Sequence, residues 1–113
     1  MSLTIVADDL TGACDTGCLF AGGGPVPLSL WPAAPPRAAV RVVDTESRAA
    51  DEKDAVARVT RVPAMAPATR YFKKVDSTLR GHVGPEVDAL MLATGLVTAL
   101  LCPAFPAQRR VVI

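Results

Sequence analysis

The chain has 113 residues, of which 50% are hydrophobic, and its formal net charge is +1. This length accommodates one domain with a single hydrophobic core and excludes a second complete domain. Because the charges are spread along the chain without a basic stripe or an acidic tail, we expect a small-molecule partner and no nucleic acid. No apolar stretch is long enough to span a membrane, so we expect a cytoplasmic protein without membrane contact.

Strands and a helix alternate in the first half of the chain. Residues 3–7 predict a buried strand, and a helix follows that the Gly22–Pro25 stretch ends. Residues 26–30 and 40–43 predict two further strands, separated by a proline-rich loop. The first helix is expected to place the following residues on one face: Leu10, Cys14, Gly17, Cys18 and Ala21.

The second half of the chain repeats this alternation. Residues 49–62 have helical spacing that the prolines at positions 63 and 67 are expected to stop, and residues 71–75 predict a strand. A helix is expected from a cap at Gly84 to a stop at Gly95. Residues 97–102 form an apolar run that predicts a last strand.

This order of elements predicts an α/β fold. We expect three layers, with a mostly parallel sheet and helices on both faces, in a Rossmann-like arrangement. The chain ends on residues 111–113, an apolar and β-prone trio. We therefore expect residues 1–113 to form a single partial domain that is incomplete at its C-terminus and cut off within a strand.

The cysteines and the histidine carry little functional signal. Cys14, Cys18, Cys102 and His82 are not spaced as zinc ligands usually are, so we predict no metal site in this chain. We interpret the thiols as structural. His82 is expected in a loop near the mouth of a pocket.

Three polar clusters each follow an apolar run. They are residues 7–12 (ADDLTG), 44–48 (DTESR) and 73–81 (KKVDSTLRG). In an open α/β sheet, ligands bind outside the carboxyl ends of the parallel strands. The three clusters therefore predict one shared site for a small polar ligand.

Each cluster also has a structural interpretation. Asp8 and Asp9 can accept hydrogen bonds from substrate hydroxyls or take a proton, but one of them, or Thr11, can instead cap the first helix. Arg48 can hold a carboxylate with two hydrogen bonds, or it can be a solvated residue at a helix start. In the third cluster, strand alternation favours Lys74, and not Lys73, on the side of Asp76.

Nucleotide-binding motifs are absent from the sequence. There is no G-x-x-x-x-G-K-[ST] and no G-x-G-x-x-G segment, so ATP has no evident site. A strand that ends in Asp8-Asp9-Leu10-Thr11 also suggests an aspartate-nucleophile phosphatase. Such enzymes typically carry Asp-x-Asp-x-Thr, and the adjacent aspartates break that spacing.

Four segments together resemble the N-terminal domain of the four-carbon acid sugar kinase family. They are residues 8–17 (DDLTGACDTG), 45–48 (TESR), 73–81 (KKVDSTLRG) and 103–108 (PAFPAQ). The resemblance implies ATP-dependent phosphorylation of sugar acids such as threonate, erythronate or 3-oxo-tetronate. It also implies that ATP and Mg²⁺ bind a separate C-terminal domain, which is missing here.

The resemblance and the strand-end positions give one set of candidate site residues. Arg48 or Arg80 is expected to bind the substrate carboxylate, while a catalytic aspartate orients the reacting hydroxyl and accepts its proton. The catalytic candidates are Asp9 and Asp76, and the substrate-binding candidates are Asp8, Thr11, Ser47, Arg48, Lys74, Ser77 and Arg80.

Two residues depart from the family pattern. His82 stands where Asn is common, and Arg109 stands where Gly is usual, which puts the conformation after Gln108 in question. With the end at Ile113, this suggests a shortened protein, a proteolytic remnant or an interrupted gene, and we predict that the chain alone has no kinase activity. The alternative is a non-catalytic module that binds a small acid or pairs with a partner chain, for which a homodimer through an exposed strand edge is expected.

Overall fold

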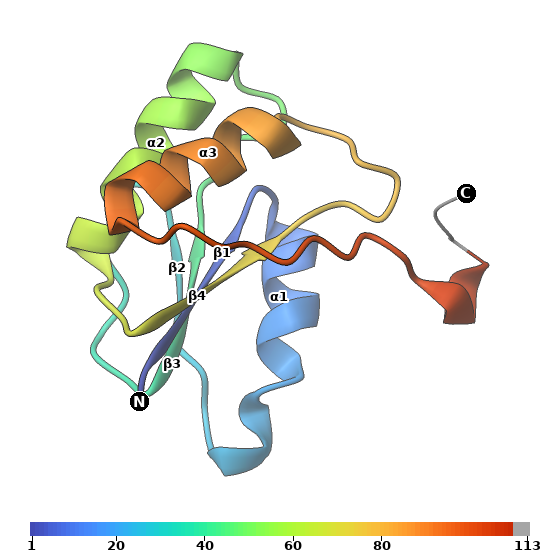
Figure 1. Ribbon diagram of the computed structural model, residues 1–113. Helices are drawn as coiled ribbons and strands as arrows, with labels where there is room; N and C mark the ends of the chain where they lie inside the picture. Colours follow the sequence, from blue (N-terminus) through green and yellow to red (C-terminus); the bar gives the residue numbers. More distant parts are fainter. Residues whose placement is uncertain (110–113) are drawn as a thin grey trace.

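Four parallel strands form the centre of the structure, a computed structural model in which residues 1–109 are described (Figure 1). β1 (Leu3–Ala7) lies between β3 (Val40–Asp44) and β4 (Arg70–Lys74). The short strand β2 (Leu28–Leu30) pairs with the outer side of β3. The strand order is β2-β3-β1-β4, and all three pairings are parallel, which confirms the predicted parallel sheet.

The carboxyl ends of the three longer strands lie level with one another. Ala7 at the end of β1 is in register with Asp44 on β3 and with Lys74 on β4. The chain segments that follow these strands therefore leave the sheet at the same edge, which is where an open parallel sheet binds its ligands.

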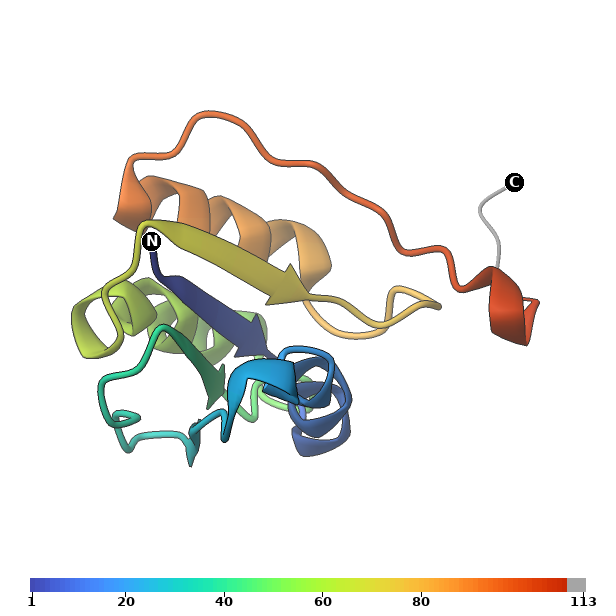
Figure 2. The ribbon, with the colours of Figure 1, turned by 90° about the horizontal axis from the view of Figure 1, so that it is seen from below.

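Helices cover both faces of the sheet. α1 (Leu10–Cys18) packs on one face, and α2 (Glu52–Met65) and α3 (Val83–Thr94) pack together on the other (Figures 1 and 2). This arrangement confirms the three-layer α/β prediction. Within residues 1–109, no helix is long and apolar enough to cross a membrane.

The hydrophobic core has two parts because successive strand residues point to opposite faces of the sheet. Val6 and Val43 lie in the cluster that faces α2 and α3. Ile5 and Val42 lie in the cluster on the side of α1. All four side chains are fully buried, so both faces of the central strands are packed against helices.

The buried face of α1 differs from the predicted one. Its buried residues are Gly12, Ala13, Thr16 and Gly17, whereas Leu10, Cys14 and Cys18 are exposed. A β-carbon at position 17 would lie 3.2 Å from Val42 Cγ2, so the helix approaches the sheet through its smallest residues. Cys102 is exposed as well, so none of the three cysteines is a core residue.

α2 begins and ends three residues later than predicted. Asp51 is its N-cap, and the Asp51 Oδ1 atom accepts a hydrogen bond of 2.8 Å from the Asp54 backbone N–H. Pro63 lies within the last turn of the helix and does not stop it. The buried face of α2 is the predicted one, with Ala55, Val59 and Val62 fully buried.

α3 begins one residue before the predicted cap. Its N-cap is His82, whose Nε2 atom lies 2.6 Å from the backbone oxygen of Ala50. Gly95 ends the helix in the left-handed conformation with φ of 73°, as its position after the last helical residue predicted.

The strand predicted for residues 97–102 is not formed. In the described part of the chain, no backbone hydrogen bond joins this segment to β4, and Val97 and Leu100 are 90% and 96% exposed. An apolar segment forms a strand only where its backbone can hydrogen-bond to a neighbouring strand. Here the segment passes beside α3 and β4 without such bonds. The strand end expected at residues 111–113 lies outside the described residues.

Candidate functional site

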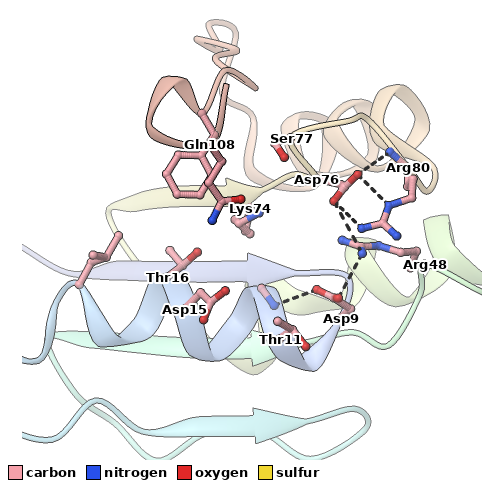
Figure 3. A pocket seen from close by; sticks show the side chains of 13 residues that line it. Asp9, Thr11, Asp15, Thr16, Arg48, Lys74, Asp76, Ser77, Arg80 and Gln108 are labelled. Atoms are coloured by element: carbon pink, nitrogen blue, oxygen red, sulfur yellow. Dashed lines mark hydrogen bonds and ion pairs between the residues drawn. The ribbon is translucent and has the colours of Figure 1, made fainter. Parts of the chain in front are cut away.

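A cavity of about 480 Å³ opens at the carboxyl edge of the sheet, along one side of α1 (Figure 3). Its walls come from α1, from the loops after β3 and β4, and from the short turn η2 (Pro106–Gln108). The volume is within the range typical of small-molecule sites. The lining residues are Asp9, Thr11, Gly12, Asp15, Thr16, Leu19, Arg48, Lys74, Asp76, Ser77, Arg80, Phe105 and Gln108.

Asp9 both caps α1 and faces the cavity. Its Oδ1 atom accepts a hydrogen bond of 2.9 Å from the Gly12 backbone N–H, and its Oδ2 atom lies 3.1 Å from Nη1 of Arg48. A β-carbon on residue 12 would lie 2.7 Å from Asp9 Oδ1, so the absence of a side chain at Gly12 leaves room for the carboxylate. The capping interpretation and the site interpretation of Asp9 therefore hold together.

Arg48 is surrounded by three carboxylates. Its Nη2 atom lies 3.0 Å from Asp8 Oδ1, and its Nη1 atom lies 3.1 Å from Asp9 Oδ2 and 3.9 Å from Asp76 Oδ1. Burial opposes the charge of the guanidinium, but the hydrogen bonds to Asp8 and the neighbouring negative charges hold the pKa of Arg48 above its ordinary value. Arg48 therefore joins segments that follow three different strands.

Asp76 is the acceptor at the centre of the loop after β4. Its carboxylate accepts two hydrogen bonds from the Arg80 side chain, at 2.9 and 3.0 Å, and further ones from the Thr78 hydroxyl and from the backbone N–H groups of Thr78 and Arg80. The bonds from Arg80 and Thr78 outweigh the effect of burial and hold the pKa of Asp76 far below its ordinary value. Asp76 is therefore ionised at neutral pH.

Lys73 and Lys74 point to opposite faces of β4, as strand alternation predicted. Lys73 Nζ lies 3.2 Å from Glu86 Oε1 on the side of α3, whereas Lys74 lines the cavity. Lys74 Nζ donates a hydrogen bond of 2.6 Å to the Val75 backbone oxygen. Within residues 1–109, no carboxylate lies within ion-pair distance of Lys74 Nζ.

Seven of the nine predicted site residues line the cavity, and Asp8 and Ser47 do not. Asp8 is buried and binds the Arg48 side chain, while its backbone oxygen accepts hydrogen bonds from the N–H groups of Ser47 and Arg48, at 3.0 and 3.1 Å. Ser47 is fully buried, and its hydroxyl donates to Glu86 Oε2 at 3.0 Å. His82 is also absent from the cavity wall.

On the side of the cavity that α1 provides, Thr11 was predicted as a site residue, whereas Asp15 and Leu19 were not. Thr11, Asp15 and the C-cap residue Leu19 follow one another at intervals of four residues and line the cavity. Figure 3 shows Thr11 and Asp15 on the side of α1 that borders it. This i, i+4 spacing was the available signal, because residues four apart share a helix face. Phe105 and Gln108 complete the wall, and both belong to the PAFPAQ segment.

A parallel α/β domain with cations and carboxylates gathered at its strand ends is typical of proteins that bind a small polar ligand. The profile of the family described as "Sugar-binding N-terminal domain" matches residues 3–113 of this chain. The chain therefore belongs to that family.

Curated relatives with similar sequences are sugar-acid kinases. The chain is 44% identical over 121 residues to a D-threonate kinase of Bordetella bronchiseptica, a match that covers 96% of this chain and 30% of the relative. It is 35% identical to a 3-oxo-tetronate kinase of Methylobacterium radiotolerans, with 97% and 29% covered, and 34% identical to a D-erythronate kinase of Heliobacterium modesticaldum, with 99% and 28% covered. The chain thus spans under a third of the length of these relatives.

Proposed function

We propose that the cavity is the acceptor site for a four-carbon sugar acid in a kinase reaction. The observation that carries the proposal is Lys74, a cavity cation that has no carboxylate partner within residues 1–109. An ammonium group in this state attracts an anionic ligand. The kinase names of the relatives support a sugar acid as that ligand.

The two arginines are not equally available to the substrate carboxylate. The guanidinium of Arg48 already contacts Asp8 and Asp9, whereas the Arg80 side chain is 67% exposed and, within residues 1–109, is ion-paired with Asp76 alone. We therefore assign the carboxylate to Lys74 and Arg80. Arg48 holds the surrounding aspartates in place, because a planar guanidinium can bind several carboxylate oxygens at once.

The reacting hydroxyl is assigned to Asp9. A general base works best when its pKa is near the working pH, and the strongly lowered pKa of Asp76 makes that carboxylate a weak base. Asp9 lines the cavity next to Arg48, where it can accept a hydrogen bond from a sugar hydroxyl and then its proton. Asp76 then serves to hold and orient Arg80.

The phosphoryl donor is assigned to parts of the whole kinase other than residues 1–109. In the described residues, no group of three or more His, Cys, Asp or Glu side chains is placed to hold a metal ion. The cavity aspartates Asp9 and Asp76 are also already paired with arginines. We predict that this chain alone does not phosphorylate a sugar acid.

Calorimetric titration with D-threonate, D-erythronate and 3-oxo-tetronate tests the acceptor site. We expect Lys74→Met to weaken binding by at least about tenfold, because a charge-assisted contact to the carboxylate is lost. The control is Lys53→Met, which removes an exposed lysine on α2, across the sheet from α1. Equal binding by the Lys74→Met variant and the wild type would contradict the assignment.

A second candidate function is a small-acid-binding or partner-pairing module without catalysis. It is favoured by the apolar side chains along the β4 edge of the sheet, where Phe72 and Leu101 are 42% and 59% exposed. A dimer measured by sedimentation that dissociates on Phe72→Ser substitution would support this candidate, and a monomer would exclude the pairing. A cytoplasmic location stays a prediction, which the three free thiols support.

A further inference from the structure

Glu86 is a buried carboxylate behind the candidate site. It lies in the first turn of α3, on the face of the sheet opposite to α1, and it is only 1% exposed. Moving a carboxylate out of water is costly unless hydrogen bonds and opposite charge compensate for the lost hydration. The partners of Glu86 therefore show what this buried charge does.

The two partners of Glu86 each precede a cavity residue. Ser47 donates a hydrogen bond of 3.0 Å to Glu86 Oε2, and the next residue is Arg48. Lys73 Nζ lies 3.2 Å from Glu86 Oε1, and the next residue is Lys74. The contact between Lys73 Nζ and Glu86 Oε1 lacks hydrogen-bond geometry, so it is an electrostatic attraction between opposite charges. Glu86 thus contacts both chain segments that carry cations into the cavity.

Further hydrogen bonds connect Ser47 to the ends of the strands. The hydroxyls of Ser47 and Thr45 lie 2.7 Å apart, and the Thr45 hydroxyl donates to the Ala7 backbone oxygen at 3.0 Å. The backbone N–H groups of Ser47 and Arg48 both donate to the backbone oxygen of Asp8. The position of Arg48 therefore depends on a network that includes the buried carboxylate of Glu86.

Lys73 connects the same network to β4. Besides its contact with Glu86, Lys73 Nζ donates a hydrogen bond of 3.1 Å to the backbone oxygen of Lys74. The Lys73 ammonium group is therefore fixed between α3 and the end of β4, directly behind the residue that faces the cavity.

We propose that Glu86 is a positioning residue for the sugar-acid site, which holds Arg48 through Ser47 and Lys74 through Lys73. The expected effect of Glu86 on sugar-acid binding rests on the proposed function. Its expected effect on the order of the two loops does not. A buried ion pair is weak evidence for stability, but in some proteins buried polar or charged groups fix one arrangement of the segments that they join.

Hydrogen exchange without ligand tests the positioning directly, and Glu86→Gln is the test variant. Its amide has the shape of the carboxylate and can still bond to Ser47, but it has no charge opposite Lys73. We expect backbone amides in residues 45–48 and 74–80 to exchange at least about tenfold faster, while the amides of β1 keep the wild-type rate. The control is Asp88→Asn, which makes the same chemical change at an exposed position of α3.

A double variant, Lys73→Met with Glu86→Gln, separates positioning from stability. It removes the lysine that would otherwise be buried without a counter-charge, so we expect its unfolding midpoint to recover toward that of the wild type. If Glu86 positions the site, the two loops stay fast-exchanging and D-threonate binding stays at least about tenfold weaker.

Three outcomes would overturn the proposal. The first is exchange in residues 45–48 and 74–80 that matches the Asp88→Asn control. The second is a uniform rise in exchange that includes β1, which means a purely structural role. The third is full recovery of loop protection in the double variant. If the wild type binds no sugar acid, the proposed function fails, and the exchange pattern still decides the role of Glu86.

Discussion

The guanidinium of Arg80 binds the carboxylate of Asp76 with two hydrogen bonds, from Nε to Oδ2 at 2.9 Å and from Nη2 to Oδ1 at 3.0 Å. These two residues are four positions apart in the loop that follows β4, and both line the cavity. The pair therefore shapes one side of the candidate site before any ligand is bound.

Stability should fall in acid because of Asp76. Its pKa in the folded protein lies far below the ordinary value of about 4, so its contribution is fully present above about pH 5 and is lost as the pH falls further. In urea unfolding, we expect the wild type to be more stable than Asp76→Asn at pH 7 and this difference to shrink by pH 2.5. A difference that does not change with pH would contradict the lowered pKa.

Stability should also fall as the pH rises toward neutrality because of Asp44. Burial, assisted by the nearby Glu46 and Asp9, raises the pKa of this carboxyl to about 7. A raised pKa favours the neutral form in the folded state, so this contribution is present below the unfolded pKa and is lost as the pH rises through 7. We expect wild-type stability to decrease between pH 5.5 and 8.5, and that of Asp44→Asn to stay level. A parallel decrease in both proteins would show that Asp44 is not responsible.

Two glycines near the start of α3 should respond differently to alanine. Gly81 has φ of +89°, and a β-carbon there would lie 2.6 Å from Asp8 Oδ2. We expect Gly81→Ala to cost at least about 1–2 kcal/mol of unfolding free energy and to displace the Asp8–Arg48 pair. Gly84 has no atom within 4 Å of its β-carbon position, so Gly84→Ala is the matched control, expected to be neutral or stabilising by up to about 1 kcal/mol. Equal effects of the two substitutions, measured by denaturant unfolding, would contradict this account.

The protein should become more stable when Arg109 is replaced by glycine. It follows η2 with φ of 58°, a left-handed conformation that costs a residue with a side chain about 1 kcal/mol or more. A left-handed backbone of this kind favours glycine, which has no β-carbon. We expect Arg109→Gly to raise the unfolding midpoint slightly, and a lower midpoint would mean that the Arg109 side chain makes a stabilising contact.

The strands and their meeting point could be predicted from the sequence, because buried parallel strands are apolar runs and their carboxyl ends share one edge. The buried face of α1 could not be predicted, because the helix contacts the sheet through small residues such as Gly17 and leaves Leu10 exposed. The inward direction of Ser47 was also hidden. Ser47 follows Glu46, whose φ of 48° places its backbone in the left-handed region. Glutamate rarely adopts this conformation, so the sequence gives no sign of it.

The failed strand at residues 97–102 has a different cause. Its apolar composition is typical of a buried strand, yet Leu100 is 96% exposed and the segment has no ladder partner among the described residues. Periodicity and composition describe what a segment can bury, whereas pairing depends on which strand edge is available.

Calorimetric titration of the wild-type chain with D-threonate, D-erythronate and 3-oxo-tetronate tests the central claim most directly. A cavity lined by Asp9, Lys74 and Arg80 that accepts a sugar acid predicts saturable binding to one site for at least one of the three, weakened by added salt. A chain that is folded by circular dichroism and binds none of them would contradict the claim.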